Sequence, residues 1–174
     1  PTTWCQLPSR YVPGLVTGWV QACAGREDPP ALVLAGGAGW DERVDRALAE
    51  VPSHLRVLRP GYLRFVDLPG FLGGAVVVAY PSHGEGFGLP VLEAMACGAP
   101  VLTTNRLSLP EVGGDAVAYT EPDPASIAQA LGALLDDPER RRRLGEAGHA
   151  RAHEFTWAAS AEAHLACYAG ALSS

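Results

Sequence analysis

The chain of 174 residues contains no lysine, and all 13 of its basic residues are arginine. A lysine amine forms the Schiff base to pyridoxal phosphate, and a lysine contacts the phosphates in a Walker-type loop. Both kinds of site are therefore excluded within this sequence. Any side-chain cation that binds a phosphate here has to be an arginine, whose planar guanidinium offers two parallel hydrogen bonds.

Long apolar runs and paired cysteine motifs are lacking as well. No apolar stretch approaches the roughly 20 residues that span a bilayer, and no basic-then-apolar leader opens the chain. The four cysteines are scattered, without a Cys-x-x-Cys pair, so we expect reduced thiols in a cytoplasmic protein. A net charge of −6 and a pI near 5.3 argue against nucleic acid as a partner.

The rest of the sequence alternates between short apolar runs and amphipathic stretches. The runs at 31–35 and 75–79 are apolar at every position, which is typical of parallel strands that are buried on both faces. Weaker strand signals lie at 2–7, 55–58, 101–104 and 116–119, and helical spacing of apolar residues lies at 13–24, 41–50, 90–97 and 124–135. We also expect Asp67 to cap a short helix that ends at Gly73. The predicted fold is α/β, a Rossmann-like, doubly wound parallel sheet.

The stretch 81–100 places a glycine-rich loop between a buried strand and a helix. It follows the run at 75–79, reads Pro-Ser-His-Gly-Glu-Gly-Phe-Gly-Leu-Pro, and continues into a helical pattern that Gly98 ends. Ligands of open parallel sheets bind at the carboxyl ends of strands, and free N–H groups at a helix start favour an anion. We therefore predict an anion site where this helix begins, at Gly88, Leu89 and Pro90.

Two carboxylates, Glu85 and Glu93, belong to the same stretch. An acidic group beside a phosphate would repel it, so hydroxyl groups explain these residues better. A carboxylate accepts two O–H donors well, which suits a sugar or a ribose. Anion donors and hydroxyl acceptors around one loop indicate a sugar nucleotide.

The segment GEGFGLPVLEAMACGAPV at 84–101, with its Glu85-x7-Glu93 spacing, resembles the signature of retaining GT-B glycosyltransferases of group 1. That group includes many bacterial mannosyl- and glucosyltransferases. The likeness continues through Leu109-Pro110-Glu111-Val112, Gly114-Asp115-Ala116 and Phe155-Thr156-Trp157. It covers nearly the whole chain but only the second half of such an enzyme. The implied fold is the C-terminal half of a GT-B fold, with a nucleotide-sugar donor-binding domain at 1–155. The implied helix at 156–174 crosses, in relatives, to the N-terminal domain.

The resemblance also implies roles for individual residues. Glu85 would hold hydroxyls of the donor sugar beside the reacting carbon, and Glu93 would hold those of the ribose. Arg10 would contact the diphosphate, with a solvated loop cation as the alternative. The remaining implied contacts are the backbone N–H groups of Gly86, Phe87 and Gly88 to sugar and phosphates, the helix start at Leu89 and Pro90 to the diphosphate, and Tyr62 and Leu63 to the nucleobase. For Tyr62 the alternative is packing at the sheet edge.

The implied reaction moves a hexosyl group from a nucleoside-diphosphate sugar to an acceptor with retention at the anomeric carbon, without a metal or cofactor. The acceptor would be bound by an N-terminal domain outside this chain, so we expect the chain alone to bind donor weakly and to turn over little. The final helix would then be exposed, folded back, or shared with another copy by self-association. Two alternatives stay open, namely a nucleotide-sugar epimerase of the GT-B type and a non-catalytic nucleotide-sugar-binding module. His149 and His153 lack a third ligand at suitable spacing, so no metal site is expected.

Overall fold

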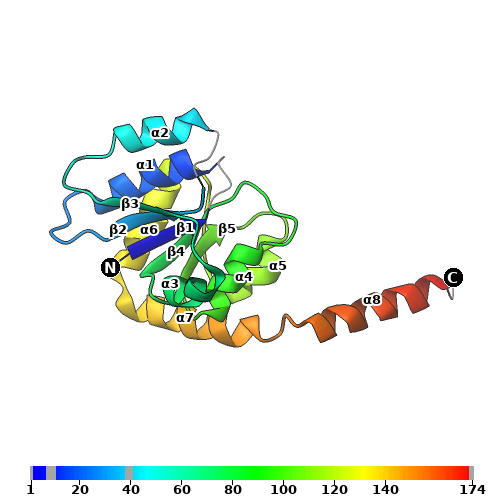
Figure 1. The fold of residues 1–174 in the computed structure, drawn as a ribbon. Helices are drawn as coiled ribbons and strands as arrows, with labels where there is room; N and C mark the ends of the chain where they lie inside the picture. Colours follow the sequence, from blue (N-terminus) through cyan, green and yellow to red (C-terminus); the bar gives the residue numbers. More distant parts are fainter. Residues whose placement is uncertain (1, 7–10, 38–40, 173–174) are drawn as a thin grey trace.

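The computed structural model describes residues 2–6, 11–37 and 41–172, which build a six-stranded sheet with helices on both faces (Figure 1). The strand order is β3-β2-β1-β4-β5-β6, and every neighbouring pair is parallel. The strands are β1 (Thr2–Gln6), β2 (Ala31–Ala35), β3 (Val57–Gly61), β4 (Val77–Tyr80), β5 (Val101–Thr104) and β6 (Ala118–Thr120). This topology confirms the predicted doubly wound α/β fold.

Helices fill both layers around the sheet. They are α1 (Val12–Cys23), α2 (Glu42–Ala49), α3 (Leu68–Gly73), α4 (Leu89–Ala96), α5 (Leu109–Gly113), α6 (Pro124–Asp136), α7 (Pro138–Ala152) and α8 (Trp157–Leu172), with short 3-10 turns η1 (Phe65–Asp67) and η2 (Gly114–Ala116). Helix α1 packs against α2 and α6, whereas α4 packs against α3, α5 and α7. Helix α7 leaves α6 and runs beneath α4 (Figure 1).

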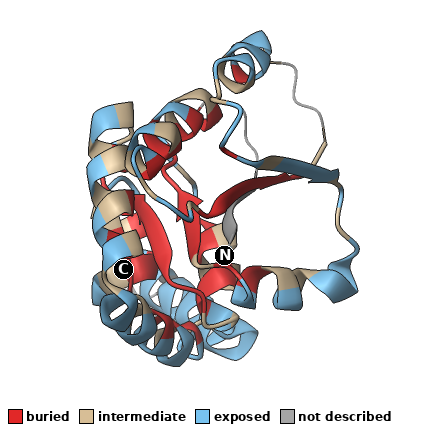
Figure 2. Ribbon diagram, turned by 90° about the vertical axis from the view of Figure 1, so that its left-hand side faces the viewer, coloured by how far each residue is buried: buried red, intermediate tan, exposed pale blue. Residues whose placement is uncertain are grey.

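The core lies where the sequence has its unbroken apolar runs. Strands β2, β4 and β5 are buried at every residue, and they form the red centre of Figure 2. Trp19 of α1 is fully buried, and its indole Nε1 donates to the carbonyl of Pro30 over 3.1 Å. Because covered parallel strands have no solvent face, their sequences need no polar alternation, and this is why these strands were predictable.

The structure differs from several local expectations. The last strand begins at Ala118 and not at Ala116, because the 3-10 turn η2 takes up Gly114–Ala116. The third strand begins at Val57, since a turn in which Leu55 N–H donates to Pro52 O occupies the preceding residues. The strand continues through Pro60, which is tolerated because β3 lies at the sheet edge. Helix α3 ends at Gly73 as predicted and Asp67 occupies its N-cap position, but the Asp67 carboxylate binds the Arg64 guanidinium at 2.6 and 3.0 Å and makes no capping hydrogen bond.

Helix α8 extends away from the body of the chain (Figure 1). Thr156 caps it, as its Oγ1 accepts from Ala159 N–H at 3.1 Å, and residues 157–171 are all exposed. The helix is mostly alanine and large apolar residues, with Trp157 91%, Leu165 67% and Tyr168 61% exposed. Within the described ranges, the structure has no helix that is both long enough and apolar enough to cross a membrane.

Leu107 is the one residue other than glycine with a positive φ, 48°, among those the structure describes. The left-handed region is strained for leucine, and a side chain that is 78% exposed recovers little by burial. We expect Leu107→Gly to raise the free energy of unfolding by about 1 kcal/mol, which corresponds to an increase in Tm of about 2–4 °C in a domain of this size. Calorimetry would measure this, with the exposed Leu58→Gly as the control, which should be destabilised. An unchanged or lower Tm for Leu107→Gly would contradict the strain.

Candidate functional site

The sheet order reverses between β1 and β4. From β1 the chain builds outward through β2 to β3, and from β4 it builds the other way through β5 to β6. Ligands of open α/β sheets bind outside the carboxyl ends of the strands at such a switch point. At this edge β4 ends with Tyr80, and residues 81–88 lead into α4. The glycine-rich loop singled out from the sequence therefore occupies the position where such folds bind their ligands.

Hydroxyl groups of the neighbouring segment fix the backbone of this loop. Thr103 Oγ1 donates to Tyr80 O at 2.9 Å, and Thr104 Oγ1 donates to Ser82 O at 2.6 Å. Both threonines are fully buried. Ser108 Oγ donates to the carbonyl of Glu85 at 2.9 Å. These hydrogen bonds restrain the loop backbone without a ligand, and such restraint lowers the entropy that binding has to overcome.

The carboxylate of Glu85 is held through one of its two oxygens. Its Oε1 accepts from Tyr80 Oη at 2.9 Å and from Ser82 Oγ at 2.7 Å. The residue is half-buried, and no side chain or N–H group in the described part of the chain donates to Oε2. The arrangement orients a carboxylate and leaves one oxygen able to accept from a hydroxyl group.

The start of α4 has no capping side chain. Gly88 occupies the N-cap position with a φ of 100°, and a Cβ there would meet Leu109 Cδ2 at 2.7 Å, so only glycine fits. Leu89 is exposed and Pro90, which has no N–H group, is half-buried in the first turn. The exposed positive end of the helix dipole lies at this point, which favours an anionic ligand.

Glu93 lies one turn into α4, where it is half-buried and its side chain has no partner among the described residues. Burial raises the pKa of this carboxyl above its ordinary value. Cys97 follows one turn later, and its pKa is raised mainly by burial and to a smaller extent by the charge of Glu93. A partly desolvated carboxylate without a donor nearby is ready to accept hydrogen bonds from a ligand.

The two residues predicted at the nucleobase directly follow β3. Tyr62 is 87% exposed, and its hydroxyl lies over Gly37, where an added Cβ would come within 2.7 Å of it. The ring thus lies against the segment after β2 and is otherwise open to solvent. Leu63 is half-buried and lines an apolar pocket of about 410 Å³ with Val33, Leu58, Pro60, Gly70, Phe71 and Gly74. Its side chain thus belongs to the packing between the sheet and α3. Arg10 lies outside the described residues.

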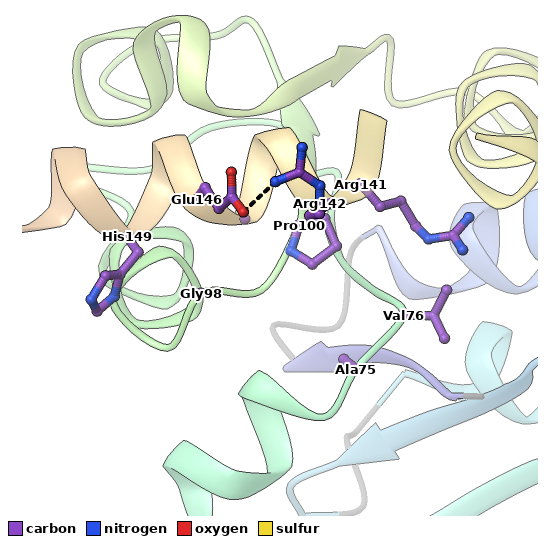
Figure 3. A pocket seen from close by; sticks show the side chains of 9 residues that line it. Ala75, Val76, Gly98, Pro100, Arg141, Arg142, Glu146 and His149 are labelled. Carbon is purple, nitrogen blue, oxygen red and sulfur yellow. Dashed lines mark hydrogen bonds and ion pairs between the residues drawn. The ribbon is translucent and has the colours of Figure 1, made fainter. Parts of the chain in front are cut away.

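A pocket of about 470 Å³ lies at the opposite, amino-terminal edge of β4 and β5 (Figure 3). Helix α7 and the residues that precede the two strands line it, and its charged side chains are engaged. Arg142 pairs with Glu139 and Glu146, Arg141 donates to main-chain carbonyls of α6, and the His149 ring bonds to Ala96 O. In the described part of the chain no cluster of metal-ligating side chains occurs, around the histidines or elsewhere. The arginines at 140–143 thus belong to a largely exposed, charged face of α7.

Sequence reasoning located Glu85 but missed the groups that orient it. Tyr80 ends β4 and Ser82 lies in the same loop, five and three residues before Glu85, whereas Ser108, which bonds to the Glu85 backbone, comes from beyond β5. A signal does exist in Thr103 and Thr104, which end an otherwise apolar strand. Buried hydroxyls need hydrogen-bond partners, so their presence indicated a neighbouring backbone that has to be held.

Comparison with known proteins gives consistent matches. The model of the family "Glycosyl transferases group 1" matches residues 16–151. O-antigen chain mannosyltransferase B of Escherichia coli is 41% identical over 134 residues, which cover 72% of this chain and 34% of that protein. D-inositol 3-phosphate glycosyltransferase of Nocardia farcinica is 36% identical over 169 residues, or 95% of this chain and 34% of that protein. The chain thus spans about a third of the length of these relatives.

Solved structures show the same fold. Sucrose-phosphate synthase from Thermosynechococcus elongatus superposes with a TM-score of 0.79 at 27% identity, over 99% of this chain and 46% of that chain. Anabaena HepE, solved in complex with UDP and glucose, gives 0.77 at 19% identity, over 98% of this chain and 48% of that chain. The fold is the Rossmann-like C-terminal half of a GT-B enzyme. The family match over most of the chain, together with the identity to its members, shows that the chain belongs to the group 1 glycosyltransferases.

Proposed function

We propose that this chain is the donor-binding part of a retaining glycosyltransferase, which moves a hexosyl group from a nucleoside-diphosphate sugar to an acceptor. The oriented Glu85 carboxylate carries the proposal, because its Oε2 can accept from a sugar hydroxyl beside the anion-favouring start of α4. Relatives named mannosyltransferase and glycosyltransferase favour transfer over epimerisation or a purely binding role.

Each part of the donor has a counterpart at this edge. N–H groups of Gly86, Phe87 and Gly88 and the helix start at Leu89 and Pro90 face the diphosphate, whose developing charge they stabilise as it leaves. From its sequence position alone, we also propose Arg10 as a cation for the diphosphate, and we assign no metal ion to the reaction. Glu93 accepts from the ribose hydroxyls, and Tyr62, with the backbone at Leu63, contacts the nucleobase. Glu85 orients the sugar and is not required as a nucleophile, since front-face attack retains the configuration.

The acceptor is assigned to a part of the enzyme outside this chain. The structural relatives are about twice as long as the matched region, and α8 leaves the domain with apolar residues around its whole circumference. A helix of that kind is normally buried. We propose that α8 packs against the acceptor-binding part and that, without it, α8 of one copy pairs with that of another.

A thermal-shift panel tests the donor assignment. UDP-, GDP-, ADP- and TDP-sugars are each added to the chain at increasing concentration. A ligand that binds only the folded state raises Tm, and a concentration 100 times Kd stabilises by about 2.7 kcal/mol. UDP-glucose is tried first, because HepE has been solved with it. We expect one nucleotide series to raise Tm and the chain alone to consume no donor. Lack of any shift refutes the proposal, whereas turnover of donor without acceptor indicates an epimerase.

A further inference from the structure

Phe155 contacts the glycine-rich loop at 81–88, called the donor loop below, from a segment near the C-terminal helix. It lies in the link between α7, which ends at Ala152, and α8, which begins at Trp157. Its ring contacts that of Phe87 edge to face, with centroids 6.1 Å apart and planes at 83°. Aromatic pairs of this geometry stabilise by about 0.5–1.5 kcal/mol beyond the area they bury. This contact therefore links the loop to a segment that follows almost 70 residues later in the chain.

Arg151 also contacts Phe155. Its guanidinium lies over the Phe155 ring, 5.5 Å from the centroid. The same group donates from Nε to Val112 O at 2.8 Å and from Nη2 to Glu111 O at 2.6 Å. These carbonyls belong to the end of α5, so a single side chain holds both the helix end and the aromatic ring. A planar guanidinium can do this because its donors and its flat face act independently.

Helix α5 and the residue before it also contact the loop. Leu109, its first residue, lies against Gly88, and Ser108 bonds to the carbonyl of Glu85. Within Gly86-Phe87-Gly88, only Phe87 has a side chain, and an added Cβ at Gly86 would meet nothing within 4 Å. The Phe87 ring is thus the one side chain by which this tripeptide can be anchored. Two side chains therefore pack against the loop, Leu109 from α5 and Phe155 from the α7–α8 link. Arg151 contacts both supporting segments, through its hydrogen bonds to α5 and its stacking on Phe155.

We propose that Phe155 and Arg151 are positioning residues for the donor loop, aligning the N–H groups of Gly86, Phe87 and Gly88 with the diphosphate. The inference rests on the proposed function. Pre-organised donors bind an anion with less loss of entropy than mobile ones, so a loosened loop binds the diphosphate more weakly. The residue proposed at the nucleobase, Tyr62, follows β3 in another part of the sheet edge, so we expect nucleoside binding to be unaffected.

The test uses Phe155→Ala, with Trp157→Ala as the matched control. Both remove an aromatic ring near the α7–α8 link, but Trp157 is the first residue of α8 and is 91% exposed. Calorimetry measures binding of the nucleoside-diphosphate sugar that gives the largest thermal shift, and of the corresponding nucleoside. For Phe155→Ala we expect a two- to tenfold loss, about the value of an aromatic pair, for the nucleotide sugar only. Phe155→Tyr keeps the ring and should restore binding, and Trp157→Ala should bind like the parent.

Three results would overturn the assignment. They are unchanged binding by Phe155→Ala, an equal loss for the nucleoside, and an equal loss in Trp157→Ala. If Phe155→Ala does not fold, Arg151→Lys decides by the same criteria, since it keeps the charge but loses the fork that holds α5. A parent chain that binds no nucleotide sugar refutes the proposed function and this inference together. The thermal-shift panel on the parent chain gives that result before any substitution is made, so the two failures can be told apart.

Discussion

Replacing Glu85 by glutamine should weaken binding of a nucleoside-diphosphate sugar about 10- to 100-fold and leave binding of the free nucleoside diphosphate within about twofold. The range corresponds to one hydrogen bond to a charged acceptor, about 1.5–3 kcal/mol. Glutamine keeps the size of the side chain and an oxygen that accepts from Tyr80 and Ser82. The change therefore acts on the acceptor strength of the second oxygen and not on the loop. Titration calorimetry with both ligands gives the two affinities.

Glu121→Gln is the control for this substitution. Glu121 follows β6 at the same edge of the sheet, is exposed, and pairs with Arg106 at 2.7 Å. The substitution Glu121→Gln removes one negative charge near the site and leaves the Glu85 carboxylate unchanged. Both affinities should therefore stay close to those of the parent. If Glu121→Gln and Glu85→Gln lower the affinities alike, the effect is one of net charge. If Glu85→Gln binds the nucleotide sugar like the parent, Glu85 does not hold the sugar.

Replacing Glu93 by glutamine should weaken binding of both the nucleotide sugar and the nucleoside diphosphate by about 10- to 100-fold at neutral pH. Both ligands lose affinity because both contain the ribose, and Glu93 accepts hydrogen bonds from its hydroxyl groups. The same change should raise the Tm of the free chain. Burial raises the pKa of Glu93, so the ionised form is less favourable in the folded than in the unfolded state. Stability is therefore lost as pH rises from the unfolded pKa through the raised folded one, and glutamine removes that loss.

The pH dependence separates this reading from a merely structural one. Hydroxyl donors favour the ionised carboxylate, so binding lowers the pKa of Glu93 and releases protons near its raised value. Affinity of the parent should rise with pH through that value, and the dependence should vanish in Glu93→Gln. The exposed Glu50→Gln serves as the control and should keep the dependence. A Glu93→Gln variant that binds normally, or that is less stable at neutral pH, would contradict the assignment.

Much of the fold could be predicted because it depends on local pattern. The run Ala75-Val-Val-Val-Ala indicated a buried strand, and β4 lies within two residues of it. The helix after Gly88 begins and ends where its glycines indicated, as Gly98 follows it with a φ of 71°. At Asp67 the N-cap position was predicted correctly, but its carboxylate forms a bidentate ion pair with Arg64 in place of a capping hydrogen bond. Such competition depends on side-chain geometry and not on spacing.

The site could be predicted in outline only. Glu85 and Glu93 follow from one loop and one helix, and their sequence positions fix which edge of the sheet they occupy. The groups that give Glu85 its orientation come from β4 and the loop after it, and Ser108 comes from beyond β5. The contact between Phe87 and Phe155 brings together residues from opposite ends of the second half of the chain. Contacts of this kind are set by tertiary packing, which a single sequence does not record.

A crystal structure of the chain with the nucleotide sugar selected by thermal shift tests the central claim most directly. We predict the diphosphate at the N-terminus of α4, Glu85 Oε2 within about 3 Å of a sugar hydroxyl, and the Glu93 carboxylate at the same distance from the ribose. A nucleotide bound in the pocket beneath α7, or a bound donor from which both carboxylates point away, would contradict the account.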